Sequence, residues 1–258
     1  MPKVLSEGQV DRFHREGFIT PIRVLSADEM ARYREHLEAF EAKFPEHRRK
    51  LKSKLHLLCP WVDDIARHDR ILDVYEDLIG PNILCYSMAF CIKEPDGKTF
   101  PGGTRIAPIN QSKQLAIGAL ALFECSVGTG CLSVIPRSHK GGTLSHEDTG
   151  NPDSILSRGQ YITEDFDKSN AVDSALEPGE IGILNSEIIY GSRVNLVDDR
   201  RIMLLVEMMP THVEARAHCN TRVLVRGIDI FGHVDIDCSP EVEFVQDEPS
   251  AWKKAIRK

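Results

Sequence analysis

Two short patterns in the sequence combine histidine and aspartate at a spacing that could hold a divalent metal. They are the tripeptides His146-Glu147-Asp148 and His233-Val234-Asp235. A common non-heme iron site, the facial triad, joins two histidines and one carboxylate. His212 and His218 also follow a late strand, but they have no obvious carboxylate partner in the sequence. The sequence therefore favours surface or packing roles for all of these histidines.

Other cofactor signals are sparse. The seven cysteines form no CxxC pair and follow no secretory signal, which indicates buried free thiols in a cytoplasmic protein. The sequence has no Rossmann glycine fingerprint and no P-loop. A net charge of −7 and a pI of about 5.8 argue against a nucleic-acid binder or a binder of anionic membranes. No apolar stretch of about 18 residues predicts a membrane span.

Residues 1–80 are predicted to be mainly helical and to support a core. Ser6 is a predicted helix N-cap, and Ser26 with Glu29 fits a capping box. The helix over 69–79 is predicted from apolar residues at helical spacing. In chain order, we expect a helix from Ser6 to Gly17, an edge strand over 18–24, and helices over 27–43 and 69–79.

From residue 82 the pattern changes to short apolar segments separated by Gly and Pro turns. The predicted strands are 82–93, 115–125, 131–135, 181–185, 201–209 and 221–226. We therefore predict a mainly β fold with flanking helices, in which a jelly roll (a double-stranded β-helix, cupin-like) occupies 81–228. The polar stretch 143–175 fits a functional lid and a plain surface insertion equally well. A single domain over 1–258 is the simplest organisation.

Several motifs resemble those of one known family and follow its order along the chain. They are Leu5-Ser6-xx-Gln9-Val10-xx-Phe13-xxx-Gly17-Phe18, the run from Gly130 to Lys140, Leu176-Glu177-Pro178-Gly179-Glu180-Ile181, and Tyr190-Gly191-Ser192-xx-Asn195. On these motifs the chain resembles the phytanoyl-CoA dioxygenase (PhyH) family of Fe(II)/2-oxoglutarate oxygenases. The resemblance implies the same jelly-roll fold.

The resemblance also implies iron-ligand positions at which this chain carries other residues. Members of that family supply a histidine and an aspartate from one segment and a second histidine from a later one. Matched to the motifs, these positions fall on Gly102, Thr104 and Tyr190. None of the three residues can replace an imidazole or a carboxylate in the usual facial triad. We therefore expect the family's scaffold without its metal site, and no cofactor.

An arginine in the family binds the far carboxylate of 2-oxoglutarate, and Arg201 matches it eleven residues after Tyr190. A guanidinium group recognises a carboxylate through two parallel hydrogen bonds, so an anion pocket can persist without iron. Arg200 and Gln111 are counted with Arg201 as candidate substrate-binding or anion-binding residues. The alternative is that one arginine of the pair is a structural ion-pair partner.

Tyr190, Thr104 and Arg105 are the predicted catalytic residues. A tyrosine beside a cationic arginine can donate or accept a proton, and an arginine can stabilise an enolate or another oxyanion. These abilities suit isomerisation, cyclisation or elimination on a carbonyl compound.

Three hypotheses about function follow from these residues. The preferred one is a metal-independent, non-oxidative enzyme that acts on a small molecule. The resemblance implies that this enzyme belongs to natural-product biosynthesis. The second is a non-catalytic subunit that supports a partner pathway enzyme. The third is an Fe(II)/2-oxoglutarate oxygenase whose ligands come from other positions.

Overall fold

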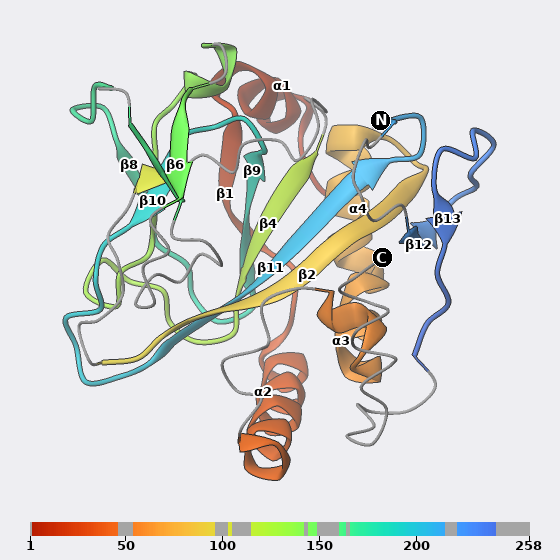
Figure 1. The fold of residues 1–258 in the computed structure, drawn as a ribbon, viewed down its shortest axis with the longest axis horizontal. Coiled ribbons are helices and arrows are strands. Elements are labelled where there is room, and N and C mark those ends of the chain that lie inside the picture. The colour runs from red at the N-terminus through yellow and green to blue at the C-terminus, as the bar shows by residue number, and fades with distance from the viewer. Residues whose placement is uncertain are drawn as a thin grey trace.

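The computed structural model describes residues 2–45, 54–95, 103–104, 115–141, 144–148, 160–163, 166–214 and 221–240. Within these residues the chain forms a seven-stranded, a four-stranded and a two-stranded sheet, with helices along the largest (Figure 1). None of the helices in this part of the chain combines the length and the apolar composition needed to cross a bilayer.

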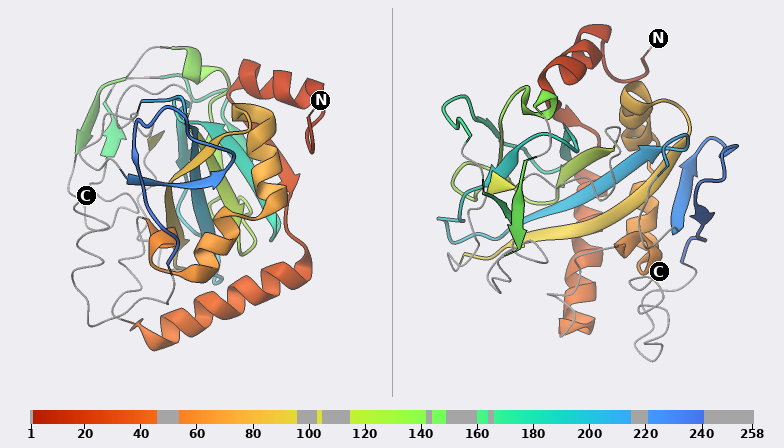
Figure 2. Two further views of the ribbon diagram at one scale, coloured as in Figure 1. Left: turned by 90° about the vertical axis from the view of Figure 1, so that its right-hand side faces the viewer. Right: turned by 45° about the horizontal axis from the view of Figure 1, so that its top comes forward.

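Four α-helices lie in the described part of the chain, and the first two begin at the capping residues that the sequence predicts. They are α1 (Glu7–Glu16), α2 (Ala27–Lys43), α3 (Pro60–Ala66) and α4 (Asp69–Ile79), with 3-10 turns η2 (Leu55–Leu57) and η3 (Ser138–Lys140). Ser6 and Ser26 both make complete capping boxes, and Gly17 ends α1 with a φ of 85°. The predicted helices are confirmed, whereas α3 is an additional helix that starts at Pro60. Helices α1 and α2 lie on opposite sides of the molecule (Figure 2).

The strands form the two facing sheets of a jelly roll. The large sheet has the order β1 (Phe18–Arg23), β9 (Glu180–Asn185), β4 (Ala116–Ala121), β11 (Arg201–Pro210), β2 (Ile83–Lys93), β12 (Thr221–Arg226) and β13 (Asp235–Ile236). The small sheet has the order β3 (Gly103–Thr104), β10 (Tyr190–Ser192), β5 (Leu132–Val134) and β8 (Val172–Ser174). The predicted jelly roll is confirmed, and β1 is the edge strand expected from its sequence.

The large sheet separates two apolar cores, and β11 contributes to both. Its residues facing the helices are Ile202, Leu204, Val206 and Met208. On the opposite face, Met203 and the partly buried Leu205 pack into the space between the two sheets, where Tyr190 also lies. Side chains alternate along a strand, so Arg201 and Glu207 belong to this interior face as well. Strand β11 therefore carries a cation and a carboxylate into the barrel.

The stretch 143–175, expected as a lid or a surface insertion, is partly built into the barrel. Its last strand, β8, pairs with β5 and completes the small sheet. Strands β6 (His146–Asp148) and β7 (Gln160–Ile162) form a separate antiparallel pair. The insertion interpretation is therefore wrong for residues 172–174, which are a structural part of the jelly roll.

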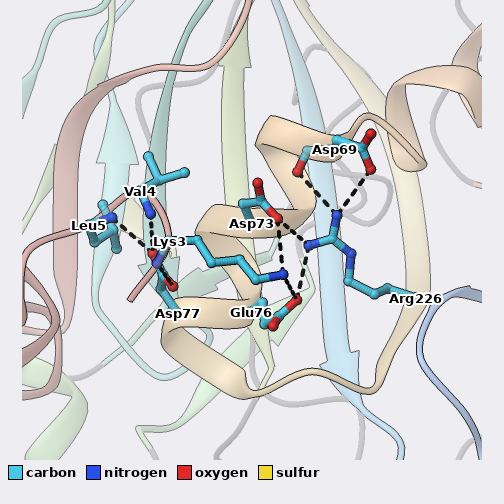
Figure 3. Close-up of polar contacts among 8 residues, drawn as sticks. All are labelled: Lys3, Val4, Leu5, Asp69, Asp73, Glu76, Asp77 and Arg226. Carbon is cyan, nitrogen blue, oxygen red and sulfur yellow. Dashed lines mark hydrogen bonds and ion pairs between the residues drawn. The ribbon is translucent and has the colours of Figure 1, made fainter. Parts of the chain in front are cut away.

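Helix α4 is joined to two distant parts of the chain by polar contacts (Figure 3). Arg226 of β12 pairs with Asp73, with Glu76 at 3.0 Å and with Asp69 at 3.2 Å. The Asp77 carboxylate accepts hydrogen bonds from three consecutive backbone N–H groups, those of Lys3, Val4 and Leu5. These contacts fix the N-terminal segment and β12 to the same helix.

Candidate functional site

Tyr190 and Thr104 lie directly opposite each other in the small sheet. Strand β10 pairs with β3 in a register that matches Tyr190 to Thr104 and Gly191 to Gly103. The family resemblance puts these two residues at iron-ligand positions from separate segments, and the structure brings their backbones together. Gly102, Arg105 and Gln111 lie outside the described residues, so their predicted roles stay predictions.

The Tyr190 side chain points into the barrel and packs against apolar residues of the large sheet. It is 7% exposed and belongs to the same core as Ile117 and Met203. Its hydroxyl makes no hydrogen bond with any residue that the structure describes. The hydroxyl of a buried tyrosine without a protein partner is available to a ligand, because an unpaired polar group in such a place is unfavourable.

The environment of Tyr190 keeps its phenol protonated. The pKa of Tyr190 is raised well above its ordinary value. Burial is the largest cause, the charge of Glu207 is the second, and the charge of Cys91 is the third. From the sequence we expect a tyrosine beside a cationic arginine, able to donate or to accept a proton. That expectation is wrong in its second half, because a phenol with a raised pKa is a proton donor at neutral pH and not a base.

Arg201 is fully buried at the other end of the interior face of β11. Its guanidinium group donates to the backbone carbonyl of Gly130 and to the Cys91 sulfur, the latter at 3.2 Å. The Arg201 Nε–H is buried and has no hydrogen-bond partner. One donor of this guanidinium is therefore unsatisfied within the described part of the chain, and the anion-binding role of Arg201 stays a prediction.

Lys93 adds a second buried cation beside Arg201. The two residues are paired across β2 and β11, and Lys93 is 0% exposed. The Lys93 ammonium donates to the backbone carbonyl of Arg193. Burial, and then the charge of Arg201, lower the pKa of Lys93 to about 7. No acidic side chain in the described part of the chain pairs with either cation, so this end of the barrel is a positive pole.

Arg200 points away from the barrel and has a structural role. It pairs with Glu41 of α2 at 2.8 Å and with Glu94 at 3.2 Å. This arrangement is the structural ion pair that the sequence analysis gave as the alternative for one member of the arginine pair. The prediction that Arg200 binds substrate is therefore not supported by its position, and Arg201 is the arginine directed at the interior.

Glu207 is a residue of the site that the sequence analysis missed. It lies on β11 between Ser87 of β2 and Ile117 of β4 and is only partly buried. Burial raises the pKa of its carboxyl to about 7, although the charge of Arg222 acts in the opposite direction. A single carboxylate in an otherwise apolar strand, at even spacing from Arg201, is the signal that could have identified it.

The residues at the three expected ligand positions do not fit an iron centre. Glycine offers no side-chain donor, and the Tyr190 phenol is held in its protonated form. A facial triad needs two imidazoles and a carboxylate. Among the described residues, no group of three or more His, Cys, Asp or Glu side chains could hold a metal ion.

Comparisons with known proteins agree with this architecture. The profile described as "Phytanoyl-CoA dioxygenase (PhyH)" matches residues 13–203. A probable phytanoyl-CoA dioxygenase of Caenorhabditis elegans is 26% identical over 155 residues, which cover 55% of this chain and 48% of the relative. The matches span about half the length of the curated relatives, 48% and 54%.

Solved structures share the fold at low sequence identity. The non-heme monooxygenase ThoJ, in its apo form, superimposes with a TM-score of 0.79 at 23% identity, covering 96% of this chain and 94% of that one. The epimerase SnoN, in complex with Fe3+, alpha ketoglutarate and nogalamycin RO, has a TM-score of 0.64 at 19% identity, covering 80% and 83% of the two chains. At these identities the likeness establishes the fold and no activity.

Proposed function

The chain belongs to the phytanoyl-CoA dioxygenase (PhyH) family, and from this premise we propose that it is a non-oxidative enzyme that works without a bound metal. It moves a proton on a carbonyl-containing small molecule, as an isomerase, cyclase or lyase does. The observation that carries the proposal is the Tyr190 phenol, which is buried, protonated and without a hydrogen-bond partner in the described part of the barrel. Matched to the family's motifs, Tyr190 falls on the position expected for an iron-binding imidazole.

The proposed reaction uses Tyr190 as a hydrogen-bond donor. The phenol donates to the carbonyl oxygen of the substrate and stabilises the negative charge that develops there when a proton leaves the adjacent carbon. The apolar lining from Ile117, Ala119 and Met203 strengthens this hydrogen bond, because a low-dielectric surrounding screens charge weakly. Thr104 lies opposite Tyr190 in the ladder and remains the second predicted catalytic residue.

A second candidate function follows from the family and from Arg201. Enzymes of this family typically depend on Fe(II) and 2-oxoglutarate, and a structural relative named as an epimerase holds both Fe3+ and alpha ketoglutarate. The buried Arg201 with its open Nε–H, next to Lys93, would suit the carboxylate of such an oxo acid. The candidate requires iron ligands other than the residues at the three expected positions.

Metal content and Fe(II)/2-oxoglutarate binding distinguish the two candidates. Purified protein is analysed for metals and then titrated anaerobically with Fe(II) and 2-oxoglutarate, with Arg201→Lys as the comparison variant. The proposal predicts no stoichiometric metal and no effect of a chelator on turnover of a carbonyl substrate. Tight Fe(II) binding with succinate release that depends on 2-oxoglutarate would restore the oxygenase function. Turnover that appears only after a second protein is added would instead indicate the supporting subunit.

A further inference from the structure

Glu207 is placed in the barrel interior by the alternation of β11. Met203 and Leu205 pack in the same interior core as Tyr190, and Glu207 is the next residue in this inward-facing series. Its neighbours across the ladders are Ser87 and Ile117. Leu205 and Glu207 keep partial exposure although strands cover them on both sides. The interior face of β11 is therefore less tightly filled here than at the fully buried Met203.

The carboxylate of Glu207 has no fixed partner in the described part of the chain. It forms no hydrogen bond and no ion pair with another described residue. Charged or titratable groups on four other elements interact electrostatically with it: Tyr190 of β10, Cys85 of β2, Tyr75 of α4 and Arg222 of β12. A partly buried carboxylate without a partner is unfavourable, so its presence in an apolar core points to a ligand or a reaction.

We propose that Glu207 is the catalytic base of this enzyme, and that it removes a proton from a carbon next to the carbonyl group of a neutral, largely apolar substrate. The assignment rests on the proposed function and deepens it. Tyr190 and Glu207 supply complementary groups from opposite sheets of the barrel, a protonated phenol and an unpaired carboxylate. Pairs of titratable groups with different environments are typical of acid–base catalysis.

The step is balanced without an oxidant. The Glu207 carboxylate takes a hydrogen from carbon as a proton, and the electron pair of the broken C–H bond forms a C=C bond. The carbonyl π pair moves to oxygen, where the Tyr190 hydroxyl stabilises the enolate by a hydrogen bond. The Glu207 carboxylic acid then returns the proton to the same carbon from the other side or to another carbon of the enolate. The product is an isomer of the substrate, and the enzyme is unchanged.

The location of Glu207 also defines the class of substrate. Glu207 lies six residues beyond Arg201 on β11, and Arg201 and Lys93 already donate to the backbone carbonyls of Gly130 and Arg193. The surrounding side chains of Leu205, Ile117 and Met203 are apolar, and the carboxylate repels anions. These features favour a neutral ketone over an oxo acid.

Hydrogen exchange into a neutral ketone tests the proposal directly. The protein is incubated in D2O with a panel of bicyclic ketones, 2-tetralone first, and deuterium next to the carbonyl is measured by mass spectrometry between pH 5 and 9. We expect Glu207→Gln to lower the exchange rate by about 10²-fold or more, the scale of a general base. Glu207→Asp should exchange faster than Glu207→Gln, because it keeps a carboxylate. Its exchange rate, like that of the wild type, should fall as the pH drops below neutral. Glu38→Gln, an exposed glutamate on α2, is the matched control and should not change the rate.

The outcomes separate the base from the proposed function. Exchange that survives Glu207→Gln but is lost in Tyr190→Phe would overturn the assignment of Glu207 and leave proton transfer intact. Exchange that survives both changes would overturn both assignments, and so would the absence of exchange with every ketone in the wild-type protein. Melting temperatures of the variants, measured in parallel, show whether a loss of rate comes from unfolding.

Discussion

Lys93 on β2 and Arg201 on β11 are paired across the strand ladder, and both side chains are fully buried. Within the part of the chain that the structure describes, their side chains donate to two backbone carbonyls and one thiol, those of Arg193, Gly130 and Cys91. Two buried cations without a carboxylate destabilise a protein, because desolvation and mutual repulsion both act against them. The pair is therefore a place where folding stability and anion binding can be measured separately.

Lys93→Met should stabilise the protein, and most strongly at low pH. The folded-state pKa of Lys93, about 7, is below its unfolded value, so burial of the ammonium opposes folding. This effect is complete below about pH 7 and is lost as the pH rises toward the unfolded pKa of about 10.4. We expect the melting temperature of Lys93→Met to exceed that of the wild type by about 3 °C or more at pH 6, and by less at pH 9.5.

The control for this prediction is Lys140→Met, which removes an exposed lysine and should leave the melting temperature unchanged at both pH values. A Lys93→Met variant that is less stable than the wild type throughout the range would show that the ammonium has an anionic partner in the folded protein. Repeating the scan with 2-oxoglutarate would then identify a carboxylate ligand at this pole.

Local patterns made much of the fold predictable from the sequence. Ser6 with Gln9 and Ser26 with Glu29 satisfy backbone groups within one helical turn, so the sequence around each cap determines where the helix begins. The register of Tyr190 against Thr104 depends on residues far apart in the sequence and was not predicted. The resemblance to family motifs only placed both residues at one site. The short strand β8 has too few residues to show an alternation.

The phase of β11 could not be predicted, and this explains the errors at the site. The strand is buried on both faces and reads as a continuous apolar run. Such a run does not reveal which of Arg200 and Arg201 points inward. It therefore leaves open whether Glu207, which shares a face with Arg201, faces the interior. Packing against α2 decides the first question, because Glu41 pairs with Arg200.

Tyr190→Phe should lower turnover of a carbonyl substrate by about 10²-fold or more while leaving the fold intact. The change removes a hydroxyl that has no hydrogen-bond partner among the described residues and keeps the buried ring. The matched control is Tyr75→Phe. The Tyr75 hydroxyl donates to the backbone carbonyl of Val206 at 2.6 Å, so its loss should cost about 1 kcal/mol of stability and little activity. Full activity in Tyr190→Phe would remove Tyr190 from the mechanism.

Glu207→Gln should raise stability above neutral pH. The pKa of Glu207, about 7 in the folded protein, is higher than in the unfolded chain, so the charged carboxylate opposes folding. This opposition is absent below the unfolded pKa of about 4.3 and complete above about pH 7. The melting temperature of the variant should therefore exceed that of the wild type at pH 8, with a smaller difference at pH 5. Equal differences at the two pH values would show that folding does not raise the pKa of Glu207, and a loss of stability at pH 8 would show that a cationic partner holds it.

Asp77→Ala should release the N-terminal segment from α4. The carboxylate accepts hydrogen bonds from the N–H groups of Lys3 at 2.7 Å and of Val4 and Leu5 at 2.9 Å, and Leu5 is buried in the core beside the helices (Figure 3). Losing these acceptors should lower the free energy of unfolding by about 1–3 kcal/mol and speed proteolysis near residue 5. Asp69→Ala is the control, because Asp69 is 97% exposed and its ion pair with Arg226 should contribute less than about 1 kcal/mol. Equal losses in the two variants would mean that the surface charge of α4, and not the backbone contacts, holds the segment.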